Sequence, residues 1–383
     1  MTRNPKIVVA PDSFKGTLSA GDVCGIWQTA FKEYFPEAEL TAVPMSDGGD
    51  GALEAIMDAT HADVGGIVAE DPLGRPVNAK YALFKGHRTA FIETAAACGI
   101  VFVKREERNP LVASSFGAGQ LIADALKFGV EELIVSIGGS ATVDGGVGML
   151  QALGFRFLDA DGKEIGRGGG ELHRIASIDA THAIPAIGRT RVRIASDVTN
   201  PLLGPDGAAT VFGPQKGATP EMVTKLEAGL AHFAKVASDS GFASDCEHKG
   251  DGAAGGMGFA LRAFLHAEMC PGAALIAELV GLEDIIKDAD LVITGEGRTD
   301  RQTLFGKLPA FVADLAAKHA VPTILCSGAV EDRAELQSRF HAVFDTVPSV
   351  MPLEEALANA RRNLADTATS IVRLLKLQWG DVK

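Results

Sequence analysis

The 383-residue sequence predicts an α/β protein with two α/β domains, one built from both ends of the chain and one inserted between them. Three observations lead to this fold class. Strand and helix patterns alternate at both ends of the chain, which is the order of elements typical of a parallel sheet. The middle of the chain differs, with short strands and loops that are dense in glycine and proline. With 46% hydrophobic and 22% charged residues, the chain is long enough for two or three domains with ordinary cores.

The first 60 residues follow the order strand, helix, strand, helix. Residues 6–10 (KIVVA) are a short apolar run typical of a buried strand. Ser19 followed by Asp22 predicts a helix N-terminus, because these two side chains can cap backbone N–H groups reciprocally, and apolar residues then recur at helical spacing. A second strand at 40–43 and a second helix from residue 52 complete the pattern, so we expect parallel strands here.

The last 100 residues repeat this order and end in a long helix. Strands are predicted within 288–300, 321–328 and 341–348, and one helix over 353–377. We therefore assign a discontinuous Rossmann-like domain to residues 1–73 plus 284–383 and an inserted α/β domain to residues 74–283.

Charge and cysteine content exclude several classes of function. A net charge of −13 and a pI near 5.2 do not provide the basic surface that nucleic acid or an anionic membrane requires, so we expect neither as a partner. The five cysteines are widely spaced without a C-x-x-C pair, which argues against a disulfide framework and a structural zinc site. The N-terminus lacks the apolar run of a signal peptide, and no stretch reaches the length of a membrane span, so we expect a cytoplasmic protein.

Polar, glycine-rich loops follow five of the predicted strands, and they are the strongest indication of an enzyme. In open parallel sheets, ligands bind beyond the carboxyl ends of the strands. Five such loops would be an unusual way to build simple turns. The residues that stand out in them are Asp12, Ser13 and Lys15; Asp47 and Asp50; Gly138, Gly139, Ser140 and Asp144; Asp197 and Asn200; and Glu296, Arg298 and Asp300.

The segment Asp47-Gly48-Gly49-Asp50-Gly51 has the composition expected where a helix start binds phosphate. Glycine costs roughly 1 kcal/mol against alanine inside a helix, so three glycines here need another explanation. A helix N-terminus exposes unpaired N–H groups that suit phosphate, and glycine lets the ligand approach the backbone. Nearby carboxylates can hold Mg²⁺. A similar string, Asp144-Gly145-Gly146-Val147-Gly148, is either a convergent turn or a second site of the same kind.

Common nucleotide and nucleophile motifs are absent from the sequence. There is no G-x-x-x-x-G-K-[ST], and GEGRTD has Asp300 where a dinucleotide fingerprint has its third glycine. ASSFG at 113–117 lacks the first glycine of a nucleophile elbow. We expect His266 and His319 to pack or cap at helix ends. Lys216 is left open between a surface charge and a functional group.

Five blocks of sequence together resemble the bacterial type-1 glycerate kinase family. They are VAPDSFKGTLSA (9–20), SDGGDG (46–51), IGGSATVDGGVGMLQALG (137–154), SDVTNPLLGPDGAATVFGPQKGA (196–218) and ADLVITGEGRTDRQTLFGKLP (289–309). The resemblance implies ATP- and Mg²⁺-dependent phosphorylation of D-glycerate, a place in glyoxylate and glycerate metabolism, and an active site in the cleft between two α/β domains. Bacterial members of the family yield 2-phosphoglycerate, whereas other glycerate kinases yield the 3-phosphate, and the sequence does not choose between them.

The resemblance and the chemistry of phosphoryl transfer together suggest roles for the loop residues. Asp197 is the first candidate for the general base, and Lys15 and Arg298 are candidates for binding the substrate carboxylate or the γ-phosphate. The candidate magnesium ligands, direct or through water, are Asp47, Glu296 and Asp300. The residues expected to bind substrate or phosphate are Asp12, Ser13, Gly48, Gly49, Gly138, Gly139, Ser140, Asn200, Gly295 and Gly297.

The sequence departs from the family pattern at three positions, and other functions stay open. Asp50 stands where Glu is usual, Val143 where Asn is usual and Ser196 where Cys is usual, which weakens a metal role for residue 50 and a ligand contact at residue 143. An NAD-dependent hydroxyacid dehydrogenase would share the fold and the substrate class, although the dinucleotide fingerprint is broken. A non-catalytic sugar-acid binding protein would need no ATP. The oligomeric state is open, with a homodimer as one candidate.

Overall fold

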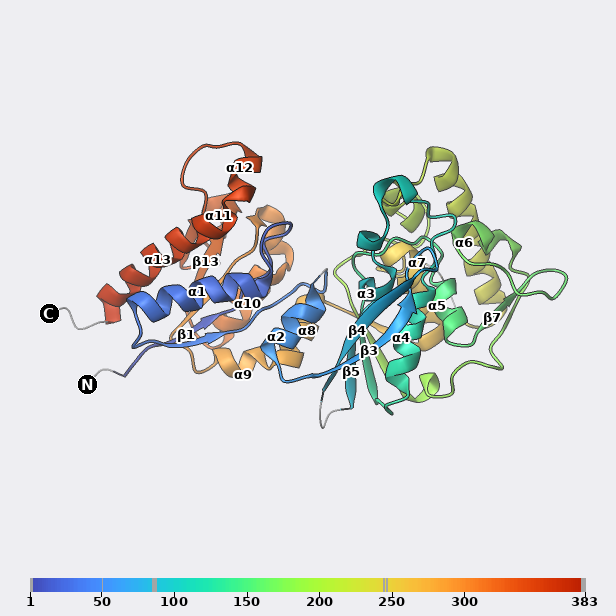
Figure 1. The fold of residues 1–383 in the computed structure, drawn as a ribbon, viewed down its shortest axis with the longest axis horizontal. Coiled ribbons are helices and arrows are strands. Elements are labelled where there is room, and N and C mark those ends of the chain that lie inside the picture. Colours follow the sequence, from blue (N-terminus) through green and yellow to red (C-terminus); the bar gives the residue numbers. More distant parts are fainter. Residues whose placement is uncertain (1–2, 50, 85–87, 244, 246, 380–383) are drawn as a thin grey trace. The chain divides into compact units, whose positions relative to one another are not determined.

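The chain packs as two compact units in a computed structural model that describes residues 3–49, 51–84, 88–243, 245 and 247–379 (Figure 1). The first unit consists of Met1–Asp47, Glu54–His61 and Ala273–Lys383, and the second of Gly48–Leu53 and Ala62–Gly272. Both units are α/β, which confirms the predicted fold class. The boundaries near 73 and 284 stay a prediction about independently folding domains. Asp50 lies outside the described residues.

The first unit is built on a parallel sheet of order β15-β13-β11-β1-β2, so β1 lies between a strand from each end of the chain. The three central strands β1, β11 and β13 are short and almost wholly buried, as expected when helices cover both faces of a parallel sheet. The strands are β1 (Lys6–Val9), β2 (Glu39–Ala42), β11 (Leu291–Thr294), β13 (Thr323–Ser327) and β15 (Ala342–Asp345), with a separate parallel pair of β12 (Arg298–Thr299) and β14 (Ala329–Val330).

The helices of this unit pack their apolar faces on the sheet. α1 and α13 run side by side (Figure 1) and bury Trp27, Phe31 and Ile371 against β1 and β11. Ser19 begins α1 as predicted: its hydroxyl accepts from Asp22 N (3.1 Å), and the Asp22 carboxylate accepts from Ser19 N (3.1 Å). The helices are α1 (Ala20–Tyr34), α2 (Ala52–Ala59), α8 (Gly272–Val280), α9 (Leu282–Ile286), α10 (Leu308–Lys318), α11 (Arg333–Leu336), α12 (Leu353–Ala358) and α13 (Ala360–Trp379).

The single helix predicted over 353–377 is wrong, because the structure has two helices there. α12 ends at Asn359, whose side-chain amide donates to the Glu355 carbonyl (2.9 Å) and so competes with continued helical bonding. α13 then begins at Ala360. The break allows the short helix α12 to follow a different course from α13. Residues of α12 line a pocket of the first unit.

The second unit has a six-stranded mixed sheet of order β10-β9-β6-β5-β4-β3, in which β3, β4 and β5 pair antiparallel and the rest are parallel. A two-stranded antiparallel pair, β7 with β8, lies apart from it. The strands are β3 (Asp63–Glu70), β4 (Pro76–Phe84), β5 (Thr89–Glu93), β6 (Glu132–Ser136), β7 (Arg156–Leu158), β8 (Ser177–Asp179), β9 (Arg191–Ala195) and β10 (Glu268–Cys270).

Helices and short turns connect these strands, and a cluster of phenylalanines fills the core beneath them. Phe157 and Phe259 pack edge-to-face on Phe233, at ring distances of 5.8 and 5.6 Å. The helices are α3 (Ala95–Cys98), α4 (Phe116–Leu126), α5 (Val147–Ala152), α6 (Pro220–Asp239) and α7 (Ala253–Leu265). Single helical turns lie at Ile100–Phe102, Arg105–Glu107, Gly169–Arg174, Ile187–Arg189, Ala208–Phe212 and Pro214–Lys216, and in the first unit at Arg301–Phe305.

Two predictions about single residues can be checked directly. His266 caps the C-terminus of α7 in the left-handed region (φ 53°), and His319 caps α10 and bonds Glu283 (3.0 Å), which confirms both helix-end assignments. Among the cysteines within the described ranges, Cys24, Cys98 and Cys326 are buried thiols. Within those same ranges, the helices are all too short or too polar to span a membrane.

Candidate active site

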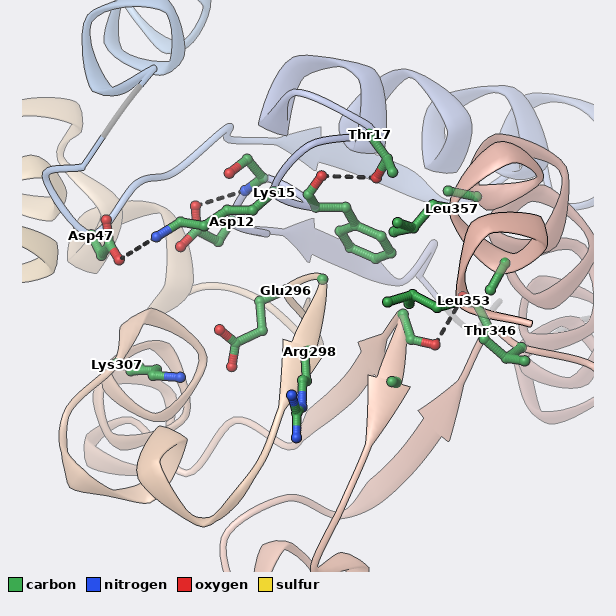
Figure 2. A pocket seen from close by; sticks show the side chains of 18 residues that line it. Asp12, Lys15, Thr17, Asp47, Glu296, Arg298, Lys307, Thr346, Leu353 and Leu357 are labelled. Carbon is green, nitrogen blue, oxygen red and sulfur yellow. Dashed lines mark hydrogen bonds and ion pairs between the residues drawn. The ribbon is translucent and has the colours of Figure 1, made fainter. Parts of the chain in front are cut away.

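A pocket of about 310 Å³ in the first unit is lined by the loops that follow β1, β2, β11 and β13 (Figure 2). Backbone hydrogen bonds hold these loops together: Asp12 N donates to Gly295 O (2.8 Å) and Met45 N to Pro11 O (3.0 Å). Gly295 is required for this packing, because a Cβ there would lie 1.8 Å from Cys326 O. The carboxyl ends of the strands therefore gather the predicted polar residues at one place.

The pocket has a charged end and an apolar end. Asp12, Lys15 and Asp47 lie together at one side in Figure 2, with Glu296 and Lys307 below them. Leu353 and Leu357 of α12 lie at the opposite side and form an apolar wall. Other apolar residues that line the pocket are Phe14, Val347, Ala356 and Ala360. Leu353 and Leu357 keep 73% and 46% of their surface exposed, so the wall presents apolar area to the pocket that the protein itself does not cover.

Asp12 is the most perturbed acid in the pocket. It is buried, and burial raises its pKa to about 7; the negative charge of Asp47 adds to this, with a smaller effect of Glu296. The bond from Ser13 N to its carboxylate (2.7 Å) and the charge of Lys15 act in the opposite direction. Three carboxylates thus share one small region, where a bound cation would relieve their mutual repulsion.

Lys15 and Asp47 form an ion pair with 3.8 Å between Nζ and Oδ2 (Figure 2). The Lys15 side chain is 71% exposed, so its ammonium group is free to reorient toward a ligand. Arg298 also lines the pocket, but its guanidinium binds Glu331 (2.7 Å) on the exposed side. Of the two predicted cations, Lys15 is therefore the better placed to bind an anionic ligand.

Glu296 is held in a fixed orientation by two threonines. Its Oε1 accepts from Thr303 Oγ1 (2.7 Å) and Thr299 Oγ1 (3.1 Å), and Thr299 is itself bonded to Ser327 (2.8 Å). Burial raises the pKa of Glu296, although both threonine hydrogen bonds oppose that shift. The two threonine hydrogen bonds both go to Oε1 and not to Oε2.

The oxygen-rich donor set suits Mg²⁺ rather than a softer metal. Within the part of the chain that the structure describes, no three His, Cys, Asp or Glu side chains converge in a geometry that encloses a metal ion. Magnesium does not need such a cage, because it usually keeps several waters and binds one or two carboxylates together with substrate phosphates. Asp47 and Glu296 fit that requirement, whereas Asp300 does not line the pocket and lies 3.9 Å from Lys307 Nζ.

A second pocket, of about 280 Å³, lies in the second unit at the carboxyl ends of β6 and β9. Gly138, Gly139 and Ser140 line it. Gly48 and Gly49 pack closely against this region, since a Cβ on Gly138 would lie 3.2 Å from Gly49 Cα and a Cβ on Gly48 3.3 Å from Ala195 O. Close packing of two backbone loops is therefore one reason for the glycines of the Asp47–Gly51 segment.

Lys216 also lines the second pocket, and the surface-charge alternative for this residue is wrong. The side chain is buried, and its Nζ donates to Ser140 Oγ (2.9 Å) and Thr142 O (2.8 Å). Burial lowers its pKa to about 8, while the nearby Cys98 and Asp144 act to raise it. Sequence reasoning could not decide this case, because a lysine in a Gly-Pro-Gln-Lys-Gly turn is usually exposed; its tertiary packing buries it.

Asp144 has a different position from Asp47 despite the similar sequence around it. Its carboxylate is fully buried and accepts bonds from Ser115 N (2.8 Å), Ser115 Oγ (2.9 Å), Gly146 N (3.1 Å) and Gly148 N (3.3 Å). Burial raises its pKa above the usual range, although these bonds oppose the shift. Asp144 thus ties the starts of α4 and α5 together, so the later string is a structural turn.

Six of the predicted site residues line neither pocket: Gly48, Gly49, Asp197, Asn200, Gly295 and Asp300. Asp197 is exposed after β9, and its Oδ1 accepts from Gly272 N (3.1 Å). The Asn200 side chain donates to Asp206 O (2.8 Å). Residues that sequence reasoning did not select are Thr17, Lys307 and the apolar residues of α12; a lysine just before a helix start, Gly306-Lys307-Leu308-Pro309, was the one available signal.

Comparison with known proteins gives matches along the whole chain. The sequence pattern of the Glycerate kinase family matches residues 7–376. The chain is 44% identical to a Bacillus subtilis (strain 168) protein named glycerate kinase and 43% identical to an Escherichia coli (strain K12) protein named glycerate 2-kinase, each over 97% of this chain and 98% of the relative. A solved structure from Salmonella typhimurium LT2 that carries the name glycerate kinase 2 superposes with a TM-score of 0.87 at 43% identity, covering 98% of this chain and 99% of that one.

Proposed function

The chain belongs to the glycerate kinase family and is a phosphotransferase, and we propose that it transfers the γ-phosphoryl group of ATP to the 2-hydroxyl of D-glycerate, with Mg²⁺, giving 2-phosphoglycerate and ADP. Membership of a kinase family implies nucleotide use. The name of the Escherichia coli relative favours the 2-position over the 3-position. The alternatives of a dehydrogenase and of a non-catalytic binding protein have no support from these relatives.

The observation that carries the proposal is the composition of the pocket in the first unit. Carboxylates for a hard divalent cation, lysines for anionic oxygens and an apolar wall lie within one pocket. Phosphoryl transfer needs mainly positioning and neutralisation of charge on the transferred group, and this set supplies both. We propose that Asp47 and Glu296 hold Mg²⁺, directly or through water, and that Lys15 binds the phosphate chain.

The apolar wall supports placing the nucleotide in the same pocket. An adenine ring needs a flat apolar surface in addition to polar partners for its edge. Leu353 and Leu357 offer uncovered apolar surface at the end away from Asp47. A nucleotide would then extend from its base at α12 to its phosphates at Lys15 and the carboxylates. When bound, Mg²⁺ would neutralise charge on those phosphates.

Two further roles rest on residues of the second unit. Glycerate needs its hydroxyl proton accepted as the new P–O bond forms, and Asp197 remains our candidate for that base, since its carboxylate is exposed next to the second pocket's Ser196 and Val198. The Gly138–Ser140 turn remains the candidate for binding an anionic group. Product release as ADP and phosphoglycerate completes the reaction.

Phosphorus NMR of the purified protein with D-glycerate, ATP and Mg²⁺ tests the proposal. We expect a new phosphomonoester signal that requires all three components. Proton coupling identifies the product, because the 2-phosphate has one proton on C2 and gives a doublet, whereas the 3-phosphate has two on C3 and gives a triplet. A triplet would overturn the 2-position, and intact ATP with folded protein would overturn the substrate assignment.

A further inference from the structure

Lys216 is a buried cation whose hydrogen-bond partners are uncharged. Its side chain is 3% exposed, and the nearby Asp144 carboxylate, which acts to raise its pKa, accepts its own hydrogen bonds from Ser115, Gly146 and Gly148. The two acceptors it does have, Ser140 Oγ at 2.9 Å and Thr142 O at 2.8 Å, are both uncharged. Burying a charge is costly unless it is paired, so a lysine kept in this position implies a compensating anion or a functional use.

The conformation of the backbone around Lys216 directs its side chain into the interior. Pro214 starts a single helical turn, and Gly217 ends it in the left-handed region (φ 93°). A Cβ on Gly217 would lie 2.4 Å from Arg108 O, so the turn is pressed against the loop that contains Arg108. Arg108 also donates to Gln215 O (3.2 Å). This turn fixes the direction in which Lys216 points.

Lys216 and Ser140 each keep a hydrogen-bond donor that no protein group within the described ranges accepts. An ammonium has three donors, and the two acceptors named above take two of them. Ser140 Oγ accepts from Lys216 and so keeps its own hydroxyl hydrogen to donate. Lys216, Ser140, Gly138 and Gly139 all line the same pocket of about 280 Å³. A charge, a hydroxyl and a glycine-rich turn with its backbone N–H groups therefore face one small space.

We propose that Lys216 and Ser140 form an anion subsite in the second unit that binds a carboxylate or phosphate group. The ammonium of Lys216 supplies the charge, directly through its third donor and indirectly by orienting the Ser140 hydroxyl. This inference rests on the proposed function, which supplies two anions of this chemistry: the carboxylate of glycerate and the phosphate of the nucleotide or product. In either case Lys216 touches the ligand, so it is more than a brace for the 138–142 turn.

Equilibrium binding without phosphoryl transfer tests the subsite. Isothermal titration of D-glycerate, inorganic phosphate and ATP, each alone, is compared for the wild-type protein, Lys216→Met and Lys216→Arg. Lys225→Met is the control, because Lys225 is exposed on α6. Loss of a charged hydrogen bond should weaken the affected ligand about tenfold to a hundredfold in Lys216→Met. Lys216→Arg should recover part of the loss, and Lys225→Met should bind as the wild type does.

The pattern of losses identifies the anion. Weakened D-glycerate with unchanged phosphate and ATP supports a carboxylate subsite, and the reverse supports a phosphate subsite. Glycerol, in which a hydroxymethyl group replaces the carboxylate, should bind equally to wild type and Lys216→Met. Unchanged binding of all three anions by folded Lys216→Met, or a wild-type protein that binds none of them, would overturn the proposal.

A measurement on the wild-type protein covers the case in which Lys216→Met does not fold. Acetic anhydride labels lysines at a rate that mass spectrometry resolves residue by residue. We expect D-glycerate or inorganic phosphate to slow acetylation of Lys216 and to leave that of Lys225 unchanged. Equal rates with and without both anions would overturn the subsite. Because neither experiment measures transfer, a wild-type protein without kinase activity would contradict the proposed function and leave the result for Lys216 intact.

Discussion

Replacing Asp144 by asparagine should destabilise the second unit without a direct effect on catalysis. In the carboxylate, Oδ2 accepts from Ser115 N, Ser115 Oγ and Gly148 N, and Oδ1 accepts from Gly146 N. An amide can keep its oxygen at only one of these positions. In the better orientation it retains the three bonds at Oδ2 and sets its NH₂ group against Gly146 N at about the present 3.1 Å.

The expected loss of stability follows from the Gly146 N–H group, which would be left without an acceptor. A buried donor left without an acceptor costs about 1–3 kcal/mol. The three retained bonds also weaken when a charged acceptor becomes neutral, but the lower desolvation cost of a neutral amide offsets part of this. We therefore expect Asp144→Asn to lower the free energy of unfolding of the second unit by about 1–3 kcal/mol, since Asp144 is fully buried and cannot turn to water.

Amide hydrogen exchange can measure the stability of the second unit separately from that of the first. Slowly exchanging amides of β6 and α5 should exchange roughly 5- to 150-fold faster, which corresponds to the expected loss of stability. Both tryptophans, Trp27 and Trp379, lie in the first unit, so urea unfolding followed by tryptophan fluorescence reports that unit. Asp47→Asn is the matched comparison: it should change stability by less than about 0.5 kcal/mol and abolish most activity. A change below about 0.5 kcal/mol for Asp144→Asn would refute the structural role.

Three further predictions concern activity and ligand affinity. Asp197→Asn should lower kcat at least about a hundredfold with an unchanged circular dichroism spectrum, and a near-normal kcat would remove Asp197 from the role of base. Leu357→Asp should weaken ATP in equilibrium titration by about tenfold or more and leave D-glycerate unaffected; equal ATP affinity would place the nucleotide elsewhere. Anion affinity at the Lys216 subsite should be highest below pH 7 and fall as the pH rises through about 8, because burial lowers the pKa of Lys216 to about 8, although Cys98 and Asp144 oppose that shift. A flat profile from pH 6 to 10, measured by titration, would contradict this.

The sequence was informative where local chemistry decides the structure. The capping pair Ser19 and Asp22 sets the start of α1 by itself, and apolar runs such as 6–10 become strands because both sheet faces are covered. The final helix was misjudged because helical periodicity continues through Asn359, whereas the side-chain bond of that residue stops the helix. The spacing of apolar residues gives no sign that a side chain competes with the backbone for a helical hydrogen bond.

Tertiary placement was beyond the reach of sequence patterns. Asp47 and Asp144 sit in nearly the same string, yet one lines a pocket and the other is enclosed by backbone N–H groups from two helix starts. The difference comes from which distant segment covers each turn. Lys216 is a similar case, since its burial depends on Arg108 and Ser140, which lie far away in the chain. Val143, the departure from the family pattern, is buried in the core of the second unit.

The order of strands in the first sheet means that this sheet cannot be completed until late in synthesis of the chain. β1 pairs with β11, and the hydroxyl of Thr294 bonds Ala10 O across 284 residues of intervening chain. At about 5–20 residues per second, a ribosome needs roughly 15–60 s to make that stretch, while the contiguous Ala62–Gly272 segment already has every strand of its own sheet. β1 and β2 therefore leave the ribosome long before β11, the second neighbour of β1, exists. During that interval β1 presents an apolar strand with an unpaired edge, which is the kind of segment that chaperones bind and that aggregates in their absence.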